Sequence, residues 1–228
     1  MQSTIANIHY QFIPSKVLNF AGIVRTNAIL KNDIYDKYAA TAEMSGELIV
    51  CTDKTKMANR EKKLKRETYA EYMQTIDQRD TAKDAWIYNI LDGVAEQDAI
   101  LYRDEHCVII PTYTWDTINA DELHVLCLPT DKSLRSIRSL TAEHIPLLEH
   151  MKRETIRVIH DKYHIDEENL KMFFHYDPST YHLHIHFVNM ANSQARSSVE
   201  YSHELHNVMF NLSICSDYYK RATLNTRQ

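Results

Sequence analysis

Glycine is scarce in this 228-residue sequence, which contains only Gly22, Gly46 and Gly93. A glycine-rich loop that cradles phosphate groups with backbone N–H groups cannot be built from so few. Any phosphate chemistry must therefore use side chains. Cysteine is sparse as well: the four cysteines lie far apart and form no CxxC pair. This spacing argues against a disulfide framework or a cysteine-based zinc site and favours a reducing compartment.

Long apolar runs are also missing. There is no run of about eighteen apolar residues, so we expect no transmembrane helix and no membrane partner. The N-terminus lacks the pattern of a signal peptide, and the expected location is the cytoplasm, the nucleus or both. The formal net charge of −5 argues against sequence-independent binding of nucleic acid, and we expect no double-stranded nucleic acid as a partner. The composition, 44% hydrophobic and 25% charged, is typical of a soluble globular protein.

The hydrophobic pattern predicts strands at the start of the chain and helices after them. Residues 1 to about 50 contain short β-like runs, which predict a small β-rich unit. Residues 59–72 have a highly charged helical pattern, and residues 75–82 have the polarity of a connector. Residues 83–97 predict an amphipathic helix whose apolar side chains recur at spacings of three and four: Trp86, Ile90, Leu91 and Val94.

The rest of the chain predicts antiparallel strands backed by one long helix. That helix covers residues 140–163, with Thr141 as its N-cap and His144 at the position where Glu or Gln would be ideal. An α+β fold class follows from this layout. Strands are predicted in four segments, namely 99–115 (two strands and a polar turn), 122–129, 170–176 and 181–190.

Three histidines alternate along the last of these segments, YHLHIHF. Successive side chains of a strand point to opposite faces, so His182, His184 and His186 share one face. The other face carries Leu183, Ile185 and Phe187, which gives the strand a core side. A row of imidazoles opposite that core side suits an elongated polyphosphate, with one ring as nucleophile and its neighbours as hydrogen-bond donors.

Zinc binding is the competing interpretation of the three histidines. Neighbours i and i+2 on a strand lie roughly 6.8 Å apart at the backbone, whereas zinc needs nitrogen ligands at about 2.0–2.1 Å. Two of the three rings could converge on one ion, but hardly all three. No HExxH motif or cysteine pair completes the set. We therefore expect no metal and no other cofactor.

The pattern His-φ-His-φ-His-φ-φ is the histidine-triad signature, and the wider segment FFHYDPSTYHLHIHF resembles the scavenger mRNA decapping enzymes. Further blocks resemble that family in the same order: NDIYDKY, LKRETYAEY, AWIYNILDGVAEQD and SLRSIRSLTAEHIPLLEHM. The resemblance covers roughly residues 32–215. It implies a hydrolase that removes the 7-methylguanosine cap of a cap dinucleotide or short capped RNA after mRNA decay and releases 7-methyl-GMP.

The resemblance also implies catalytic roles. The family's middle triad histidine attacks the phosphate next to the methylated nucleoside and forms a covalent nucleotidyl intermediate, which water resolves, and this role corresponds to His184. His182 and His186 correspond to the residues that bind phosphate and orient or protonate it. His175 and Ser179 correspond to further phosphate contacts.

The resemblance implies that an aromatic ring and a carboxylate recognise the cap. The methylated base is flat and cationic, so it favours cation–π stacking and an acid at its Watson–Crick edge. The family's tryptophan and glutamate correspond to Trp86 and Glu96. Their spacing of ten residues, just under three helical turns at about 3.6 residues each, lets both face one way if the helix continues. Tyr113 replaces the leucine that covers the second face of the base, which suggests an aromatic sandwich with Trp86.

The sequence departs from the family near these positions. Thr112 and Thr114 replace an acid and a lysine that contact substrate, and Tyr201 replaces an arginine that contacts phosphate. The residues that contact substrate from the family's N-terminal lid correspond to Asn32, Tyr35 and Lys56 of this sequence.

The resemblance implies a homodimer of two-domain subunits. A lid and dimerisation domain at residues 1–79 is exchanged between subunits, and a catalytic histidine-triad domain follows at residues 80–228. Two other functions stay open. One is a cap-binding but weakly active relative, because charged contacts are missing. The other is a histidine-triad hydrolase of dinucleoside polyphosphates.

Overall fold

The computed structural model describes residues 64–79, 81–192 and 199–227, apart from the side chains of Lys83 and Arg227, and the backbone of five strands between residues 2 and 51. The chain divides into two compact units, residues 1–61 and 62–228. Among the described residues, no helix is long and apolar enough to cross a membrane.

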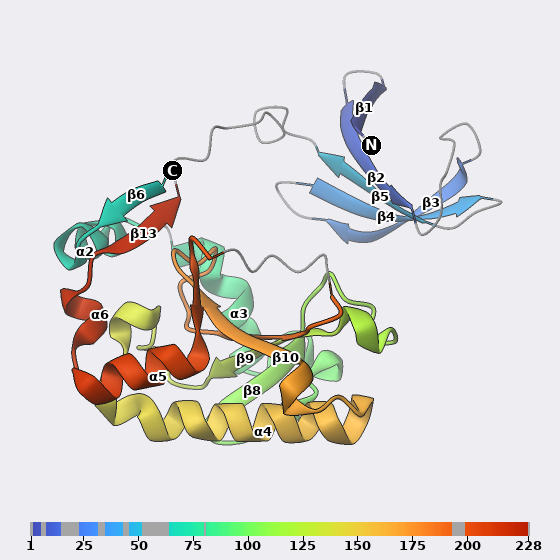
Figure 1. The fold of residues 1–228 in the computed structure, drawn as a ribbon. Helices are drawn as coiled ribbons and strands as arrows, with labels where there is room; N and C mark the ends of the chain where they lie inside the picture. The colour runs from blue at the N-terminus through green and yellow to red at the C-terminus, as the bar shows by residue number, and fades with distance from the viewer. Residues whose placement is uncertain are drawn as a thin grey trace. The chain divides into compact units, whose positions relative to one another are not determined.

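The N-terminal unit contains a five-stranded antiparallel sheet (Figure 1). Neighbouring strands follow the order β1-β2-β5-β4-β3, so the sheet has a hairpin at each edge. This agrees with the β-rich character predicted for residues 1–50. The strands are β1 (Gln2–Ile5), β2 (Ile8–Pro14), β3 (Ile23–Lys31), β4 (Tyr35–Ala42) and β5 (Gly46–Cys51).

The second unit is built around a six-stranded antiparallel sheet in the order β12-β10-β11-β9-β8-β7 (Figure 1). A two-stranded sheet pairs β6 (Leu64–Glu67) with β13 (Leu224–Arg227). Antiparallel sheets and helices together make an α+β fold, as the sequence predicts. The strands of the large sheet are β7 (Tyr102–Arg103), β8 (Cys107–Pro111), β9 (His124–Pro129), β10 (Leu170–His175), β11 (Ile185–Asn189) and β12 (Ser202–Glu204).

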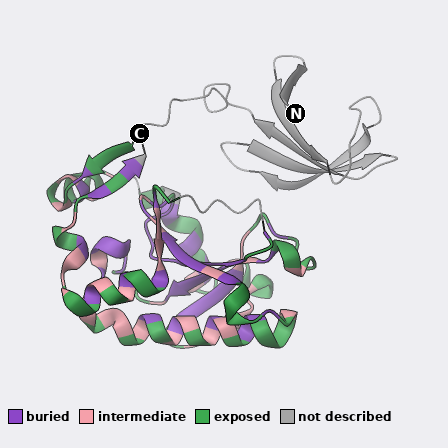
Figure 2. Ribbon diagram, viewed as in Figure 1, coloured by how far each residue is buried: buried purple, intermediate pink, exposed green. Residues whose placement is uncertain are grey.

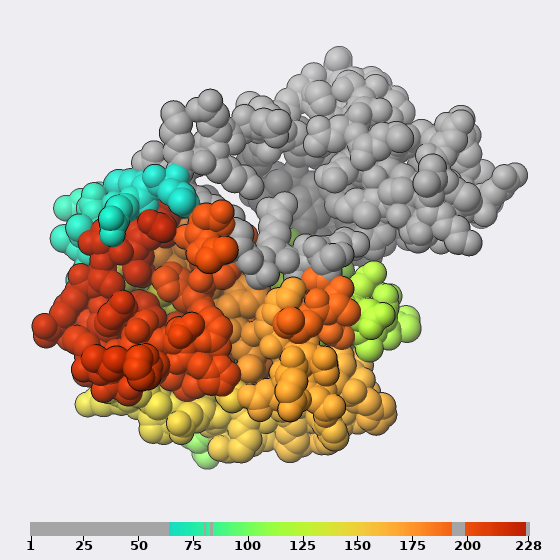
Figure 3. Space-filling view, viewed as in Figure 1, coloured from blue at the N-terminus to red at the C-terminus, as the bar shows by residue number. Residues whose placement is uncertain are grey.

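Helices cover one face of the large sheet more completely than the other. The α-helices of this unit are α2 (Tyr69–Asp77), α3 (Ala85–Leu91), α4 (Ile145–Tyr163), α5 (Leu205–Ile214) and α6 (Tyr218–Arg221). The main core lies between the sheet and α4 and α5, and it takes every second residue of each central strand, for example Ile109, Val125 and Phe187. Figure 2 shows the central strands buried, whereas α4 alternates between buried and exposed positions. In the space-filling view, α4 and α5 form a continuous surface over this side of the unit (Figure 3).

The second face of the sheet has a smaller core. Val108, Ile110, Leu126 and Leu128 point to this face and pack against the short helix α3. Because side chains alternate along a strand, the even-numbered residues of β9 and β11 share this face. The second face therefore carries His186 of β11, and the ring of His182 packs against Tyr88 of α3.

The helical segment begins at the predicted N-cap, Thr141, but α4 itself begins later, at Ile145. Thr141 and His144 form a capping box in which Nδ1 of His144 accepts a hydrogen bond of 3.0 Å from the backbone N–H of Thr141. A neutral imidazole nitrogen thus replaces the carboxylate or amide oxygen of the usual box. A 3-10 turn over residues 142–144 precedes the α-helix proper.

Helix α3 is shorter than predicted, because the amphipathic pattern over residues 83–97 does not continue as one helix. The helix ends at Leu91, and Gly93 follows with φ of +75°. A glycine in the left-handed region directly after the C-cap is a common helix stop. The buried face also differs from the prediction: Ile87 and Ile90 are fully buried, whereas Trp86 and Val94 are exposed.

Residues 64–77 pack with the second unit, so the boundary between the units lies near residue 61 instead of residue 79. The predicted helix over residues 59–72 is replaced, in its described part, by β6 followed by α2. Arg138 explains the packing, because its buried guanidinium donates to the carbonyl oxygens of Glu67 and Ala222 at 2.8 and 2.5 Å. This side chain ties β6 to the C-terminal segment that ends in β13.

Candidate active site

The three triad histidines are buried on the second face of the sheet, but only His186 lies within a strand. β11 begins at Ile185, so His182 and His184 lie in the irregular segment before it, and the predicted strand over residues 181–190 is too long. Leu183, Ile185 and Phe187 point into the main core, as the alternation predicts.

His184 has one ring nitrogen in a hydrogen bond and one available for chemistry. Its Nδ1 lies 2.7 Å from the carbonyl oxygen of His182. A carbonyl only accepts, so Nδ1 carries the proton and Nε2 carries the lone pair. The neutral ring with a bare Nε2 has the form that a nucleophile requires.

His182 is held by a hydrogen bond to β9. Its Nε2 lies 2.8 Å from the carbonyl oxygen of Pro129 at the end of β9, so this nitrogen carries the proton. Its Nδ1 is buried and has no hydrogen-bond partner among the described residues. The edge of the Tyr88 ring packs against this imidazole, with ring centroids 5.6 Å apart. His182 therefore presents a bare nitrogen that can accept a proton or a hydrogen bond.

His186 lies in a cluster of rings. Its Nδ1 is 2.9 Å from Nε2 of His124 on β9, and its Nε2 is buried without a partner among the described residues. The ring stacks on Phe173 at a centroid distance of 5.1 Å and an interplanar angle of 7°. The centroids of His175 and His184 lie 4.3 and 5.0 Å from that of His186. The fold thus brings His175 beside the triad, and its contact with phosphate stays a prediction.

Burial keeps these imidazoles neutral. It lowers the pKa of His182 to about 4, and it lowers the pKa of His184 from its usual value. The pKa of His186 lies well below its usual value, because burial acts together with the nearby His184, His175 and His124. A neutral imidazole at neutral pH keeps the lone pair that a nucleophile or a base needs.

An ion pair holds the segment just before the triad. The fully buried carboxylate of Asp84 accepts a hydrogen bond of 3.0 Å from the backbone N–H of Tyr181, and it pairs with Arg79 at 3.1 Å. Nη2 of Arg79 also donates to the carbonyl oxygen of Ser179 at 3.0 Å. The side chain of Ser179, a predicted phosphate contact, belongs to an exposed residue in this segment.

The predicted base-recognition residues are exposed. Trp86 is 41% exposed although its helix packs on the sheet, and Tyr113 is 65% exposed in the turn after β8. Trp86 is thus not a core residue. Glu96 lies beyond the end of α3, with φ of +55°, so it does not share a helix face with Trp86 as the spacing suggests. The sandwich of Trp86 and Tyr113 stays a prediction.

The three residues that replace charged contacts of the family form contacts with other residues of this chain. The hydroxyl groups of Thr112 and Thr114 lie 3.0 Å apart, and that of Thr112 donates to the carbonyl oxygen of His124 at 3.2 Å. Tyr201 is buried, and its ring packs against His175 at a centroid distance of 4.9 Å. Tyr201 therefore contacts the histidine cluster in place of an arginine.

The predicted lid contacts lie outside what the structure describes in full. Asn32 and Lys56 fall outside the described residues, and for Tyr35 only the backbone, at the start of β4, is described. Their contact with substrate stays a prediction.

Among the described residues, one group of potential metal ligands lies together: Asp104, Cys107 and His150. The carboxylate already accepts hydrogen bonds from the backbone N–H groups of His106 and Cys107, and His150 lies 2.6 Å from it. A hydrogen bond with Cys127 and burial raise the pKa of the Cys107 thiol, so it stays protonated. We assign this group to a hydrogen-bonded contact between the turn that precedes β8 and helix α4, and not to a metal centre.

Sequence reasoning did not single out His124, Asp84 or Arg79. His124 belongs to an apolar run, and its relation to His186 arises from the pairing of β9 with β11. Arg79 lies in the segment 75–82, predicted as a polar connector, and Asp84 lies at the start of the helix predicted over residues 83–97. The only local signal was the alternation of side chains along the strand, which places His124 on the same face of β9 as Leu126 and Leu128.

Comparison with known proteins agrees with the motifs. The family described as "Scavenger mRNA decapping enzyme C-term binding" matches residues 85–201. An m7GpppX diphosphatase of Ascaris suum is 35% identical over 212 residues, which cover 86% of this chain and 70% of that protein. The m7GpppX diphosphatases of Rattus norvegicus and Homo sapiens are 37% and 35% identical over 61% of this chain. The matched region spans less than half of their length, 43% and 42%.

Among solved structures, Hnt3 in complex with DNA and guanosine is 15% identical, with a TM-score of 0.42 over 63% of this chain and 88% of that one. A likeness this weak does not bear on the site. The family match covers the helix that carries Trp86, the triad and its neighbour His175, and the Ascaris relative extends the match over most of both chains. This chain therefore belongs to the scavenger mRNA decapping enzyme family.

Proposed function

We propose that this protein hydrolyses the 7-methylguanosine cap of a cap dinucleotide or short capped RNA and releases 7-methyl-GMP. Membership of the family and the relatives' name, m7GpppX diphosphatase, support this activity. The observation that carries the chemistry is the hydrogen bond from Nδ1 of His184 to the carbonyl oxygen of His182, at 2.7 Å. It leaves Nε2 of a neutral imidazole as the nucleophile.

The proposed reaction has two displacements at one phosphorus atom. In the first, Nε2 of His184 attacks the phosphate next to the methylated nucleoside. A P–N bond forms, and the P–O bond to the remaining nucleoside diphosphate breaks. In the second, water attacks the same phosphorus, a P–O bond forms and the P–N bond breaks, which frees 7-methyl-GMP and restores the neutral imidazole. Two easier steps thus replace one difficult displacement.

The neighbouring histidines assist these displacements in our proposal. In the second displacement, the bare Nδ1 of His182 can take a proton from the attacking water. His186 and His175 contact phosphate oxygens, and Ser179 contributes its hydroxyl. Donors fixed by surrounding packing stabilise the charge of the transition state without reorganising.

Base recognition falls to Trp86, Glu96 and Tyr113 in our proposal. An exposed indole offers its face to a cationic base, and stacking of one base is worth about 1–3 kcal/mol. The carboxylate of Glu96, exposed beyond the end of α3, would accept hydrogen bonds from the edge of the base.

We further propose that the N-terminal region acts as a lid and is exchanged between the subunits of a homodimer. Asn32, Tyr35 and Lys56 would then contact the substrate from the lid. This proposal rests on the family and on the compact N-terminal unit at residues 1–61. The proposed compartment is the cytoplasm, the nucleus or both, in keeping with the unpaired Cys107, Cys127 and Cys215.

The decisive experiment is turnover of methylated cap dinucleotide, with products identified by mass. Wild-type protein should release 7-methyl-GMP, and His184→Ala should release none while it keeps its melting temperature. Activity should persist in excess chelator. Turnover by His184→Ala would refute the nucleophile, and loss of activity in chelator would revive a metal-dependent mechanism.

The same assay separates two alternatives. Because Thr112, Thr114 and Tyr201 replace charged family contacts, a cap-binding protein of weak activity is the second candidate; it would bind the dinucleotide without releasing product. A hydrolase of dinucleoside polyphosphates would instead cleave methylated and unmethylated guanosine dinucleotides at equal rates. A clear preference for the methylated compound supports cap hydrolysis.

A further inference from the structure

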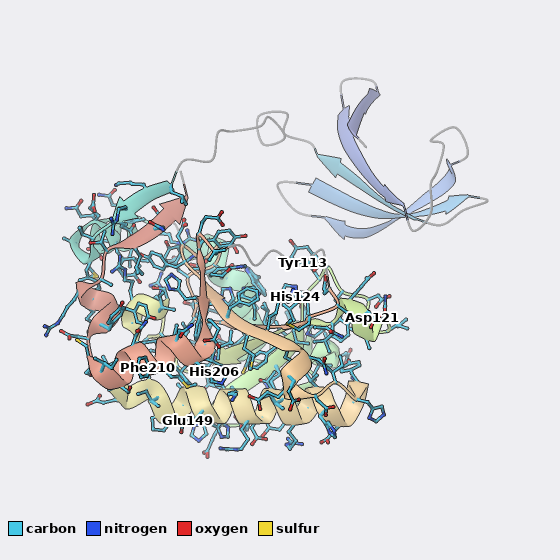
Figure 4. The ribbon with its side chains drawn as sticks, in the orientation of Figure 1. Tyr113, Asp121, His124, Glu149, His206 and Phe210 are labelled. Atoms are coloured by element: carbon cyan, nitrogen blue, oxygen red, sulfur yellow. The ribbon has the colours of Figure 1, made fainter. Side chains whose placement is uncertain are left out.

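His124 and the triad member His186 form a direct imidazole–imidazole hydrogen bond between neighbouring strands. Nε2 of His124 lies 2.9 Å from Nδ1 of His186, and the ring centroids are 5.2 Å apart. The pairing of β9 with β11 creates this contact, because His124 and His186 are near neighbours on one face of the sheet. Figure 4 labels His124 on the same side of the unit as Tyr113, away from Glu149 of α4 and His206 of α5.

One proton must lie between these two nitrogens. Whether it is bonded to His124 or to His186 decides whether Nε2 of His186 carries a proton. Neutral imidazole has one N–H group and one bare nitrogen. If His124 donates, Nδ1 of His186 is the acceptor and Nε2 of His186 carries the remaining proton. If His186 donates instead, its Nε2 is bare. Only the first arrangement gives His186 an N–H group for a phosphate oxygen.

An anionic substrate favours the first arrangement. Phosphate oxygens at neutral pH only accept hydrogen bonds, so a bare Nε2 facing them would repel them. The Nε2 atom of His186 is buried without a partner among the described residues, and an unpaired buried polar atom costs free energy until a ligand satisfies it. Because Nδ1 and Nε2 lie on different sides of the ring, a bond to His124 also turns Nε2 away from β9.

We propose that His124 is a positioning residue that holds His186 in the tautomer with a proton on Nε2, ready to donate to a phosphate oxygen of the substrate. His124 does not touch the reacting atoms itself. The inference rests on the proposed phosphoryl transfer, and it adds a fifth histidine to the machinery, after the triad and His175.

The proposal gives each triad ring a different state. His184 presents a bare Nε2 because its Nδ1 donates to a carbonyl group of its own segment. His182 presents a bare Nδ1 because its Nε2 donates to the carbonyl oxygen of Pro129. His186 presents an N–H group because His124 supplies the hydrogen bond to its other nitrogen. A nucleophile, a base and a donor thus arise from three identical side chains.

Packing alone does not explain His124. The second face of β9 otherwise carries Leu126 and Leu128, which pack on α3, so an apolar side chain would suit position 124 as a core residue. The stacking of His186 on Phe173 fixes the plane of the ring but not the tautomer. The contact with His124 is the feature that distinguishes the two ring nitrogens.

The test compares His124→Leu with His124→Gln. Leucine removes the donor, whereas the amide N–H of glutamine can still donate to Nδ1 of His186. We expect His124→Leu to lower kcat by roughly 10- to 100-fold, below the roughly 10²–10³-fold cost of removing a direct donor, with little change in KM. His124→Gln should recover most of this loss. Equal kcat in wild-type protein and both variants would overturn the proposal.

A second readout needs no substrate. Long-range ¹⁵N–¹H correlation spectra distinguish imidazoles protonated at Nε2 from those protonated at Nδ1. We expect the Nε2–H tautomer for His186 in wild-type protein and in His124→Gln, and a mixture in His124→Leu. A wild-type His186 protonated at Nδ1, or a tautomer that does not respond to His124→Leu, would contradict the inference.

The matched control is His203→Leu. His203 lies on β12 of the same sheet, is also partly buried, and packs against the rings of Tyr176 and Tyr219 instead of the triad. We expect no change in the His186 spectrum or in kcat in this variant. The spectra also separate the two proposals: if wild-type protein does not cleave caps, the proposed function fails, whereas the tautomer result stands or falls by itself.

Discussion

The buried carboxylate of Asp84 accepts a hydrogen bond of 3.0 Å from the backbone N–H of Tyr181. Asp84 precedes Trp86 by two residues, and Tyr181 directly precedes His182. One hydrogen bond therefore links the helix proposed to recognise the base with the segment that carries the triad. The distance between the base site and the reacting phosphate depends on such links, because phosphoryl transfer is sensitive to alignment.

Asp84→Ala should impair both stability and turnover. The substitution leaves the N–H of Tyr181 and the guanidinium of Arg79 without their buried partner, which should lower the free energy of unfolding by about 3 kcal/mol. Asp84→Asn keeps an acceptor for the N–H of Tyr181 and should lose less stability and less turnover. Urea unfolding and kcat check both variants. Asp92→Ala is the control, since Asp92 pairs with Lys132 in an exposed ion pair and should change stability by less than about 1 kcal/mol.

Trp86→Ala should weaken binding of methylated cap dinucleotide without unfolding the protein. Loss of one stacking platform costs about 1–3 kcal/mol, or roughly 5- to 150-fold in Kd. The melting temperature should not change, because Trp86 is exposed. Isothermal titration calorimetry measures the Kd. Val94→Ala, an exposed apolar residue of the same segment, should leave Kd unchanged, and an unchanged Kd in Trp86→Ala would remove it from the base site.

Stability should fall as the pH is lowered from about 6.5 toward 4. Burial lowers the pKa of His182 and of His124 to about 4 in the folded protein, whereas an unfolded histidine titrates near 6.5. Between these values the unfolded state binds more protons, so acid favours unfolding; the stability contribution is fully present above about pH 7 and is lost as the pH falls toward 4. The lowered pKa of His184 and of His186 adds to the slope.

Urea unfolding at pH 7.5, 6.0 and 5.0 measures this slope before most carboxylates titrate. His186→Gln should flatten it, whereas substitution of the exposed His160 by Gln should not. A free energy of unfolding that stays constant from pH 7.5 to 5.0 would show that the histidine cluster is protonated or hydrated in the folded state.

Arg138→Met should be among the most destabilising substitutions in the second unit. The guanidinium is fully buried and donates to the carbonyl oxygens of Tyr219 and Ala222 and to the hydroxyl of Tyr176. Tyr176 in turn donates to the carboxylate of Glu67. Removing the cation leaves several carbonyl groups without a donor and the Glu67 carboxylate without its positive counter-ion, at a cost of about 3–5 kcal/mol.

Denaturant unfolding of Arg138→Met tests this cost, and Arg157→Met provides the comparison. Arg157 forms exposed ion pairs with Glu154 and Asp161 on α4, which are worth at most about 1 kcal/mol. Similar losses in the two variants would mean that the buried network contributes no more than a surface pair.

Much of the fold follows from local sequence. Alternation assigned Leu183, Ile185 and Phe187 to the core and the three histidines to the other face, and the box of Thr141 and His144 marked the start of α4. These features depend on residues a few positions apart, so a single sequence contains them. The end of α3 was also encoded locally, by Gly93, but the continuing apolar pattern concealed it.

The state of each imidazole was decided by tertiary structure. The sequence by itself determined that three histidines would share a face and that the family motif surrounds them. It did not determine which nitrogen of each ring is bare, because two of the partners, Pro129 and His124, lie 53 and 62 residues away on β9. Only the register of β9 against β11 brings them within hydrogen-bond distance, and hydrogen bonds at fixed distances select the tautomers.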